Sequence, residues 1–221
     1  MTRICIALNT NDWKNAIKIV ESLREEADMF KVGLPLYLGK GKNEVEALIR
    51  DGVKVFLDLK LSDIPSVVSL SLKEIPEVEL LTLNGLGGYD MIKRAIDERP
   101  DLNIAVVTLM TSISEDWAGR IFKKGAKGVV INLCRLAAET GAWGAVVPGK
   151  MARYIRKNFK GLNLVVAGVR IKREMDDHHF ATGIESLKWM RKDDVIVLGR
   201  EITEDKDPLQ TLKRIKRKIA G

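Results

Sequence analysis

Short apolar runs alternate with longer amphipathic stretches from one end of the chain to the other. The short runs are rich in β-branched residues and have the length of buried strands. They predict strands at Ile4–Leu8, Met29–Val32, Val53–Leu59, Leu80–Leu83, Ile104–Leu109, Leu164–Val169 and Val195–Leu198. Between them, apolar residues recur at steps of three and four, as in Asp12–Ala27, Asn43–Arg50, Tyr89–Glu98 and a last helix from Pro208 onward. This alternation of strands and helices predicts a parallel sheet.

One more strand would close the sheet into a barrel, and two segments compete for it, Lys127–Asn132 and Gly144–Pro148. From Val129 onward the apolar residues follow helical spacing, and Gly141 is a suitable helix stop. We therefore predict that Ala145–Val147 is the sixth strand and that the Val129 region is helical. The predicted fold is α/β, a (β/α)8 TIM barrel.

Composition narrows the range of partners. Of the 221 residues, 46% are hydrophobic, which is ample for one core, and we expect residues 1–221 to form a single domain. The net charge of +7 permits anionic partners, either nucleic acid or phosphorylated small molecules. Aromatic residues make up only 5% and do not interleave with basic ones, so we expect no nucleic-acid partner. The basic end Lys213–Lys218 complements the dipole of the last helix.

The two cysteines, Cys5 and Cys134, lie far apart without metal-ligand spacing, and we expect buried thiols in a reducing compartment. No apolar run is long enough to span a membrane, and the start of the chain lacks the pattern of a signal peptide. These observations predict a cytoplasmic protein without a membrane partner.

The predicted strand Val53–Leu59 leads into a group of charges. Strand alternation puts Asp58 and Lys60 on the same face as Phe56, and Asp63 follows in the turn. Charges that converge on one place are costly unless they neutralise one another. The simplest interpretation is a salt bridge at the end of a strand, and the second is a catalytic site.

Polar residues also follow the other strands, whereas the strands themselves are apolar. In a β/α barrel the carboxyl ends of the strands meet on one face, where barrel enzymes hold their active sites. The residues predicted there are Asn9, Lys31, Asp58, Lys60, Asn84, Thr111, Ser112, Pro148, Arg170, Gly199 and Arg200. Packing alone does not account for this distribution, so we predict an active site on this face.

Gly199 and Arg200, after the last strand, have the chemistry of a phosphate site. A glycine lets an anion approach backbone amides, and an arginine adds a bidentate charge. Arg170 and the loop Lys172–Thr182 would lie beside them, with the loop as a lid. The two histidines of that loop have no third ligand at metal spacing. We therefore expect no metal site and interpret them as a phosphate donor or as a surface pair.

Several segments together resemble the orotidine 5'-phosphate decarboxylase family, in order and spacing, over nearly the whole chain. They are Lys31–Tyr37, Asp58–Pro65, Asn84–Gly88, Leu109–Ser112, Gly168–Arg170 and Val197–Arg200. The most specific pieces are Lys31-Val32-Gly33 and Asp58-x-Lys60-x-x-Asp63-Ile64-Pro65. Sister families, the keto-gulonate-phosphate decarboxylases and the hexulose-phosphate synthases, share the Asp-x-Lys-x-x-Asp core. They typically carry an acidic metal ligand near strand two and a glycine after the second aspartate.

The resemblance implies decarboxylation of orotidine 5'-monophosphate to uridine 5'-monophosphate, the last step of de novo pyrimidine synthesis, without metal or cofactor. It implies a catalytic array of Lys31, Asp58, Lys60 and Asp63, in a homodimer whose Asp63 and Ile64 reach into the neighbouring site. The implied substrate-binding residues are Asn9, Ile64, Val67, Thr111, Ser112, Gly168, Val169, Arg170, His179, Gly199 and Arg200. Asp58 would press negative charge against the leaving carboxylate, and Lys60 would stabilise and protonate the carbanion.

Three positions depart from the family pattern. Asn9 stands in place of an aspartate that usually binds the ribose, and Val67 in place of a threonine that closes the motif. His179, or its neighbour His178, falls where a glutamine usually holds the phosphate. Two alternative functions remain: a sister sugar-phosphate lyase, which would depend on a divalent metal, and a non-catalytic anion or RNA binder that uses the basic surface.

Overall fold

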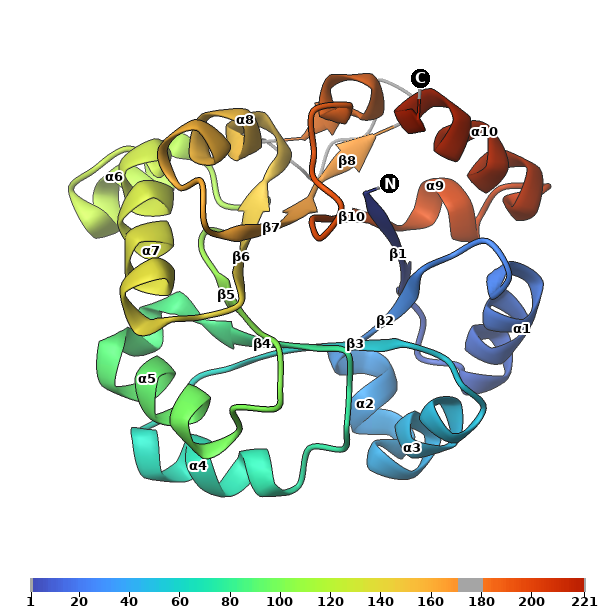
Figure 1. The fold of residues 1–221 in the computed structure, drawn as a ribbon, viewed down its shortest axis with the longest axis horizontal. Coiled ribbons are helices and arrows are strands. Elements are labelled where there is room, and N and C mark those ends of the chain that lie inside the picture. The colour runs from blue at the N-terminus through green and yellow to red at the C-terminus, as the bar shows by residue number, and fades with distance from the viewer. Residues whose placement is uncertain (1, 171–180, 221) are drawn as a thin grey trace.

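The computed structural model describes residues 2–170 and 181–220 and shows a closed barrel of parallel strands surrounded by helices (Figure 1). The barrel strands are β1 (Arg3–Leu8), β2 (Met29–Gly33), β3 (Val55–Leu61), β4 (Leu80–Asn84), β5 (Ile104–Val107), β6 (Gly144–Pro148), β7 (Asn163–Ala167) and β10 (Val195–Leu198). Their order around the barrel follows the chain, and β10 closes it against β1. The predicted α/β TIM-barrel fold is therefore confirmed.

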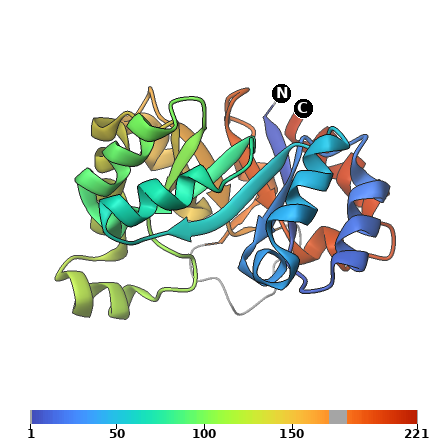
Figure 2. The same cartoon turned by 90° about the horizontal axis from the view of Figure 1, so that it is seen from below.

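Helices connect the strands on the outside of the barrel. They are α1 (Trp13–Leu23), α2 (Leu34–Lys40), α3 (Lys42–Arg50), α4 (Pro65–Lys73), α5 (Gly88–Glu98), α6 (Glu115–Phe122), α7 (Ala126–Thr140), α8 (Gly149–Asn158), α9 (Arg200–Thr203) and α10 (Pro208–Ala220). Smaller elements are the 3-10 helices η1 (Gly85–Gly87) and η2 (Ile184–Leu187) and the strand pair β8 (Val169–Arg170) and β9 (Thr182–Gly183). Side-on, the yellow-green α6 lies at the edge opposite the N terminus (Figure 2). None of the described helices is both long and apolar enough to cross a membrane.

The two candidates for the sixth strand are now distinguished. Gly144–Pro148 forms β6, whereas the Val129 region lies in α7, which ends at Gly141 with a left-handed φ of 78°. The predicted strand Leu164–Val169 was wrong in extent, because Gly168 has a φ of 69° and separates β7 from β8. A positive φ is accessible to glycine without steric cost, so the chain can turn there.

One predicted strand and one predicted helix are shorter in the structure than the sequence predicted. The strand predicted to reach Leu109 ends at Val107, the last residue of β5 in register with β6. The first helix begins after Asp12, whose side chain accepts a hydrogen bond from the Lys14 N–H, and it ends at Leu23. This is the usual arrangement of an aspartate N-cap.

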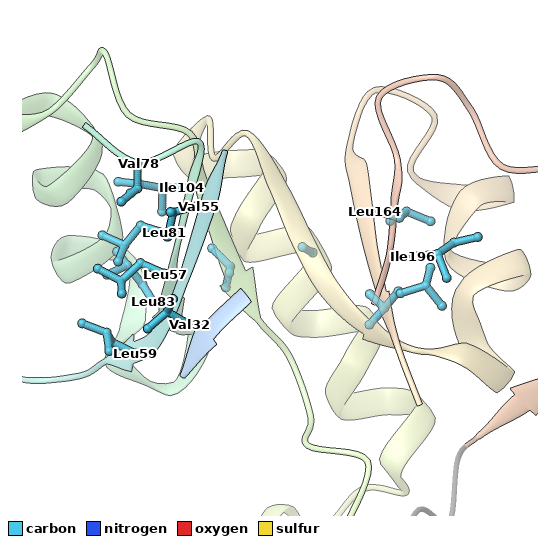
Figure 3. Close-up of a cluster of buried hydrophobic side chains, with 14 of the residues drawn as sticks. Val32, Val55, Leu57, Leu59, Val78, Leu81, Leu83, Ile104, Leu164 and Ile196 are labelled. Carbon is cyan, nitrogen blue, oxygen red and sulfur yellow. The ribbon is translucent and has the colours of Figure 1, made fainter. Parts of the chain in front are cut away.

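The core has two layers. Inside the barrel, strand residues form a small cluster of Cys5, Met29, Phe56, Leu80, Ala105, Val165 and Val195. A larger cluster includes Val32 and Leu57 on neighbouring strands (Figure 3). The alternation that separates Phe56 from Leu57 is the one predicted from the sequence. Cys5 and Cys134 are buried thiols as predicted, and burial raises the pKa of both, that of Cys134 to about 12.

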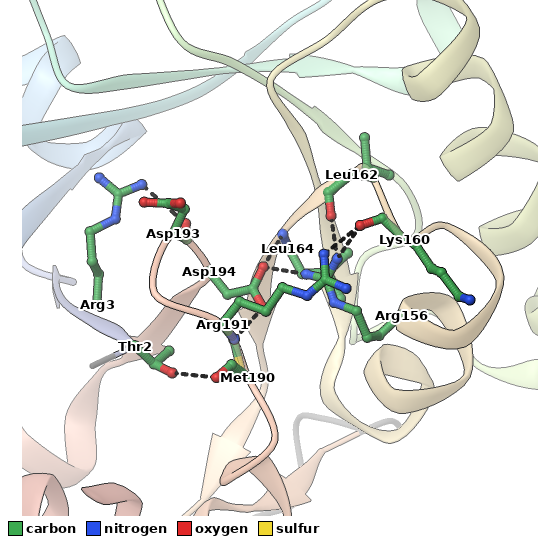
Figure 4. A network of polar contacts seen from close by, with 10 residues as sticks. All are labelled: Thr2, Arg3, Arg156, Lys160, Leu162, Leu164, Met190, Arg191, Asp193 and Asp194. Atoms are coloured by element: carbon green, nitrogen blue, oxygen red, sulfur yellow. Dashed lines mark hydrogen bonds and ion pairs between the residues drawn. The ribbon is translucent and has the colours of Figure 1, made fainter.

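At the amino ends of the strands, a buried aspartate joins three segments (Figure 4). Asp194 precedes β10, and its Oδ1 accepts hydrogen bonds from Arg156 of α8 and from the Leu164 N–H at 2.9 Å. Its Oδ2 accepts from the Arg191 N–H at 2.8 Å. Arg156 also donates to the Leu162 carbonyl at 2.7 Å, so both buried charges have partners. A paired and hydrogen-bonded charge is the form in which burial is tolerated.

We expect Asp194→Asn to lower the free energy of unfolding by about 3–5 kcal/mol, because it leaves the Arg156 guanidinium buried without its counter-charge. Urea unfolding followed by circular dichroism measures the change. The matched control is Asp193→Asn, an exposed neighbour, for which we expect a change within about 0.5 kcal/mol. Equal losses in the two variants would contradict the role given to Asp194.

Candidate active site

The carboxyl end of β3 departs from regular strand geometry. Its pairing with β4 is in register up to Leu57–Leu81 and then jumps to Leu61–Leu83, so that three residues of β3 face one residue of β4. Within this bulge Lys60 has a φ of 51°, which places it in the left-handed region. That region is strained for a lysine, and such strain tends to gather at functional sites.

Lys31, Asp58 and Lys60 form a chain of alternating charge. Lys31 Nζ lies 3.0 Å from Asp58 Oδ2, and Lys60 Nζ lies 2.8 Å from Asp58 Oδ1. Burial by itself would raise the pKa of Asp58, but the charges and hydrogen bonds of the two lysines outweigh it and lower the pKa below its ordinary value. Asp58 therefore carries a fixed negative charge. The Lys60 side chain is 33% exposed, against 13% for Lys31, so Lys60 is the more open of the two cations.

Thr82 of β4 belongs to the same group, although it was not among the residues predicted for the site. Its side chain is fully buried, and its Oγ1 accepts a hydrogen bond from the Lys60 N–H at 2.9 Å and donates one to Asp58 Oδ1 at 3.0 Å. Thr82 lies within the apolar run Leu80–Leu83, which was interpreted only as a buried strand. The available signal is strand alternation, because Leu80 lies inside the barrel and Thr82 comes two positions later on the same face.

These charges form part of the wall of a cavity of about 260 Å³. The predicted site residues that line it are Asn9, Lys31, Asp58, Lys60, Thr111, Gly168, Val169, Arg170, Gly199 and Arg200, together with Pro148 from the predicted rim. Apolar residues that were not predicted complete the lining: Ala7, Val107, Leu109, Met110, Val146, Val147, Ala167 and Val197. A cavity with mostly apolar walls and a few convergent charges is typical of a small-molecule site.

Arg170 lines this cavity and also carries two buried hydrogen-bond donors. Its Nε and Nη2 are buried and meet no hydrogen-bond partner in the described part of the chain. Arg170 and Arg200 both line this part of the cavity, and guanidinium groups in a wall are suited to an anion. Gly199 lies in the same wall, and a Cβ added there would come 3.2 Å from Asn9 Nδ2. The absent side chain therefore keeps this part of the wall open.

The predicted phosphate lid falls largely outside the described residues. His178 and His179 belong to that undescribed segment, so the role predicted for them stays a prediction. Thr182, at the end of the predicted lid, lies in β9 and is in register with Val169 of β8. The described end of this segment therefore lies beside Val169 and Arg170, which line the cavity.

Four predicted site residues do not line the cavity. Asp63, Ile64, Val67 and Ser112 are all exposed in this single chain. Asp63 Oδ1 accepts a hydrogen bond from the Ile64 N–H at 2.7 Å in the turn before α4. Asn84, predicted at the rim, instead caps η1, because its Oδ1 accepts a backbone N–H of that turn. The single chain thus brings together Lys31, Asp58 and Lys60 but leaves Asp63 outside the cavity lining.

The lowered pKa of Asp58 predicts how stability depends on pH. Its charge stabilises the folded state above the unfolded-state pKa of about 3.9, and this contribution is lost as the pH falls through the lower folded-state value. We expect Asp58→Asn to be less stable than the native chain at neutral pH, and the difference to shrink below about pH 4. Urea unfolding over this range measures it, with Asp193→Asn as a control without such a trend. A difference that persists undiminished in acid would contradict this expectation.

Comparisons with known proteins agree on one family. The family model described as Orotidine 5'-phosphate decarboxylase / HUMPS family matches residues 2–215. A protein of Aquifex aeolicus named orotidine 5'-phosphate decarboxylase is 39% identical and is aligned over 97% of this chain and 96% of its own. One of the same name from Dictyoglomus turgidum is 32% identical, over 98% of this chain and 94% of its own. The crystal structure of orotidine 5'-phosphate decarboxylase from Lactobacillus acidophilus gives a TM-score of 0.85 at 26% identity and covers 100% of both chains. This chain therefore belongs to the orotidine 5'-phosphate decarboxylase family, as its motifs predicted.

Proposed function

We propose that this protein is a carboxy-lyase that converts orotidine 5'-monophosphate to uridine 5'-monophosphate in de novo pyrimidine synthesis. The observation that carries the proposal is the Lys31–Asp58–Lys60 array in the wall of a cavity that is also lined by Arg170 and Arg200. In the barrel order, β3 lies across from β7 and the segment that follows it. A nucleotide with a carboxylate on its base and a phosphate on its sugar could place the carboxylate beside the charges of β3 and the phosphate beside Arg170, which follows β7. The names of the relatives support the same reaction.

In the proposed reaction the bond between pyrimidine C6 and the carboxylate carbon breaks, carbon dioxide leaves, and the electron pair stays at C6. Asp58 places its fixed charge beside the leaving carboxylate, which raises the energy of the bound substrate relative to the transition state. The Lys60 ammonium stabilises the charge that develops at C6 and then donates its proton there. Lys31, 3.0 Å from Asp58, keeps that carboxylate ionised in its buried position.

The phosphate side of the site supplies binding energy at a distance from the reacting carbon. In the proposal, Arg170 and Arg200 hold the phosphate oxygens, and Gly199 leaves its backbone open to them. Gly168 and Val169 directly precede Arg170 in the chain and line the same cavity. Binding energy gained here can offset the cost of holding the substrate carboxylate against Asp58.

The remaining assignments concern the base, the ribose and the lid. Thr111 lines the cavity, and a Cβ added at Gly168 would come 3.1 Å from its Cγ2, so it packs against the turn that follows β7. We assign Thr111 and the adjacent Ser112 to the amide edge of the pyrimidine and Asn9 to the ribose. His179 is assigned to the phosphate as part of the lid, in the place of the family's glutamine.

We expect Lys60→Ala to lower kcat by roughly 10²–10⁴-fold, because one ammonium group both stabilises the carbanion and protonates it. The loss of the ultraviolet absorbance of orotidine 5'-monophosphate measures turnover, in buffer that contains a chelator. The control is Lys54→Ala, an exposed lysine next to the other end of the same strand, which should keep the native rate.

The same assay separates the alternative functions. Native turnover in Lys60→Ala would contradict the role given to this lysine. Turnover only after addition of a divalent metal would favour a sister sugar-phosphate lyase. RNA binding that weakens steeply with salt and ignores Asp58→Asn, without any turnover, would favour the anion-binding alternative.

We also propose that the protein works as a homodimer in which Asp63 and Ile64 complete the neighbouring subunit's site, with Val67 at the same interface. Both residues lie outside the cavity lining of their own chain. Apolar side chains nearby are exposed: Ile64 by 62%, Leu70 of α4 by 63%, Leu86 of η1 by 58% and Tyr89 of α5 by 46%. Exposed apolar side chains on packed neighbouring helices are typical of a subunit interface.

A cytoplasmic location remains a prediction from the sequence.

Mixed dimers test this arrangement. Lys60→Ala and Asp63→Ala chains should each be nearly inactive alone. After co-refolding, about half of the dimers should be mixed and each should hold one complete site, so activity should return to roughly a quarter of the native value per chain. If Asp63 acts within its own chain, no mixed dimer holds a complete site and activity stays absent, which would contradict the proposal.

A further inference from the structure

Thr82 lies against the bulge of β3, and its single hydroxyl makes two hydrogen bonds. The Lys60 N–H donates to Oγ1 at 2.9 Å, and Oγ1 donates to Asp58 Oδ1 at 3.0 Å. A backbone N–H can only donate, so the threonine oxygen must accept there and its own proton is directed to Asp58. Asp58 is a suitable acceptor, because its carboxylate is held ionised between two ammonium groups. One hydroxyl thus joins the backbone of Lys60 to the carboxylate of Asp58.

The bulge explains why a side chain is needed at this point. In a regular ladder the backbone of β4 would pair with successive residues of β3, but the register jumps from Leu57–Leu81 to Leu61–Leu83. The Lys60 N–H comes to lie opposite the Thr82 side chain instead. A buried N–H without an acceptor and a left-handed lysine are both unfavourable. The hydroxyl therefore stabilises the backbone conformation from which Lys60 Nζ contacts Asp58.

We propose that Thr82 is a positioning residue for the decarboxylation, which acts through Lys60 and Asp58 and does not touch the substrate. It is fully buried and absent from the cavity lining. The inference rests on the proposed function and deepens it. Without the hydroxyl, the groups that bind phosphate and ribose stay in place, whereas the two reacting side chains lose a shared anchor. Small displacements of reacting groups affect the chemical step more strongly than binding.

The test compares two substitutions at one position. Thr82→Val has nearly the same shape but lacks the hydroxyl, and we expect kcat to fall by roughly 10- to 100-fold, while KM and the Kd of uridine 5'-monophosphate change by less than about threefold. Thr82→Ser keeps the hydroxyl and should keep kcat within about threefold of the native value. Thr140→Val is the control, since it removes a buried hydroxyl of α7 that bonds to the Leu136 carbonyl at 2.9 Å. It should leave kcat unchanged.

The outcomes distinguish positioning from general support of the fold. Native kcat in Thr82→Val, an equal loss in Thr82→Ser, or a parallel loss of product binding would each overturn the inference. If Thr82→Val does not fold, Thr82→Ala removes the hydroxyl without adding volume and is judged by the same criteria. Failure of the proposed function itself is seen separately, because the native chain would then not decarboxylate orotidine 5'-monophosphate at all.

Discussion

The interaction on which this structure depends is the contact of the Asp58 carboxylate with two ammonium groups. Each carboxylate oxygen has its own lysine, Lys31 on Oδ2 and Lys60 on Oδ1. Without Asp58 the two lysines would repel each other, and without the lysines a carboxylate in this position would favour its neutral form. The three groups therefore stabilise one another, and the lowered pKa of Asp58 keeps its carboxylate ionised in the cavity wall at physiological pH.

The charged side chains at the two ends of the barrel have different surroundings. At the amino end, Asp194 uses both oxygens within the protein, and its partner Arg156 is bonded to it. At the carboxyl end, Asp58 and its two lysines lie in the wall of a cavity, and Lys60 has a strained backbone. Local backbone strain tends to gather at functional sites. The strain and the cavity both lie at the carboxyl end, which supports the proposal of a ligand site there.

The sequence predicted the barrel because its signals are local. Alternation put Phe56 and Leu57 on opposite faces of the strand, as the structure confirms, and helical spacing up to Gly141 separated a helix from the sixth strand. Alternation also put Asp58 and Lys60 on one face of the strand. It did not predict that Lys60 lies in a bulge with a left-handed backbone conformation. Such a bulge depends on pairing with β4, which no local pattern records, and Thr82 was missed for the same reason. Residues proposed to act across a dimer, such as Asp63, cannot be placed by one chain.

The bulge of β3 and the Thr82 hydroxyl act together, because the hydroxyl stabilises the strained backbone that the bulge contains. A left-handed backbone costs an L-residue roughly 1–2 kcal/mol, and a typical protein hydrogen bond returns about 0.5–1.5 kcal/mol. The bond from the Lys60 N–H to Thr82 is therefore of the size needed to offset the strain, and its second bond ties the same oxygen to Asp58. In this arrangement Lys60 Nζ lies 2.8 Å from Asp58 Oδ1 while Lys60 lines the cavity, so one threonine hydroxyl supports the backbone of the lysine and the carboxylate that the lysine contacts.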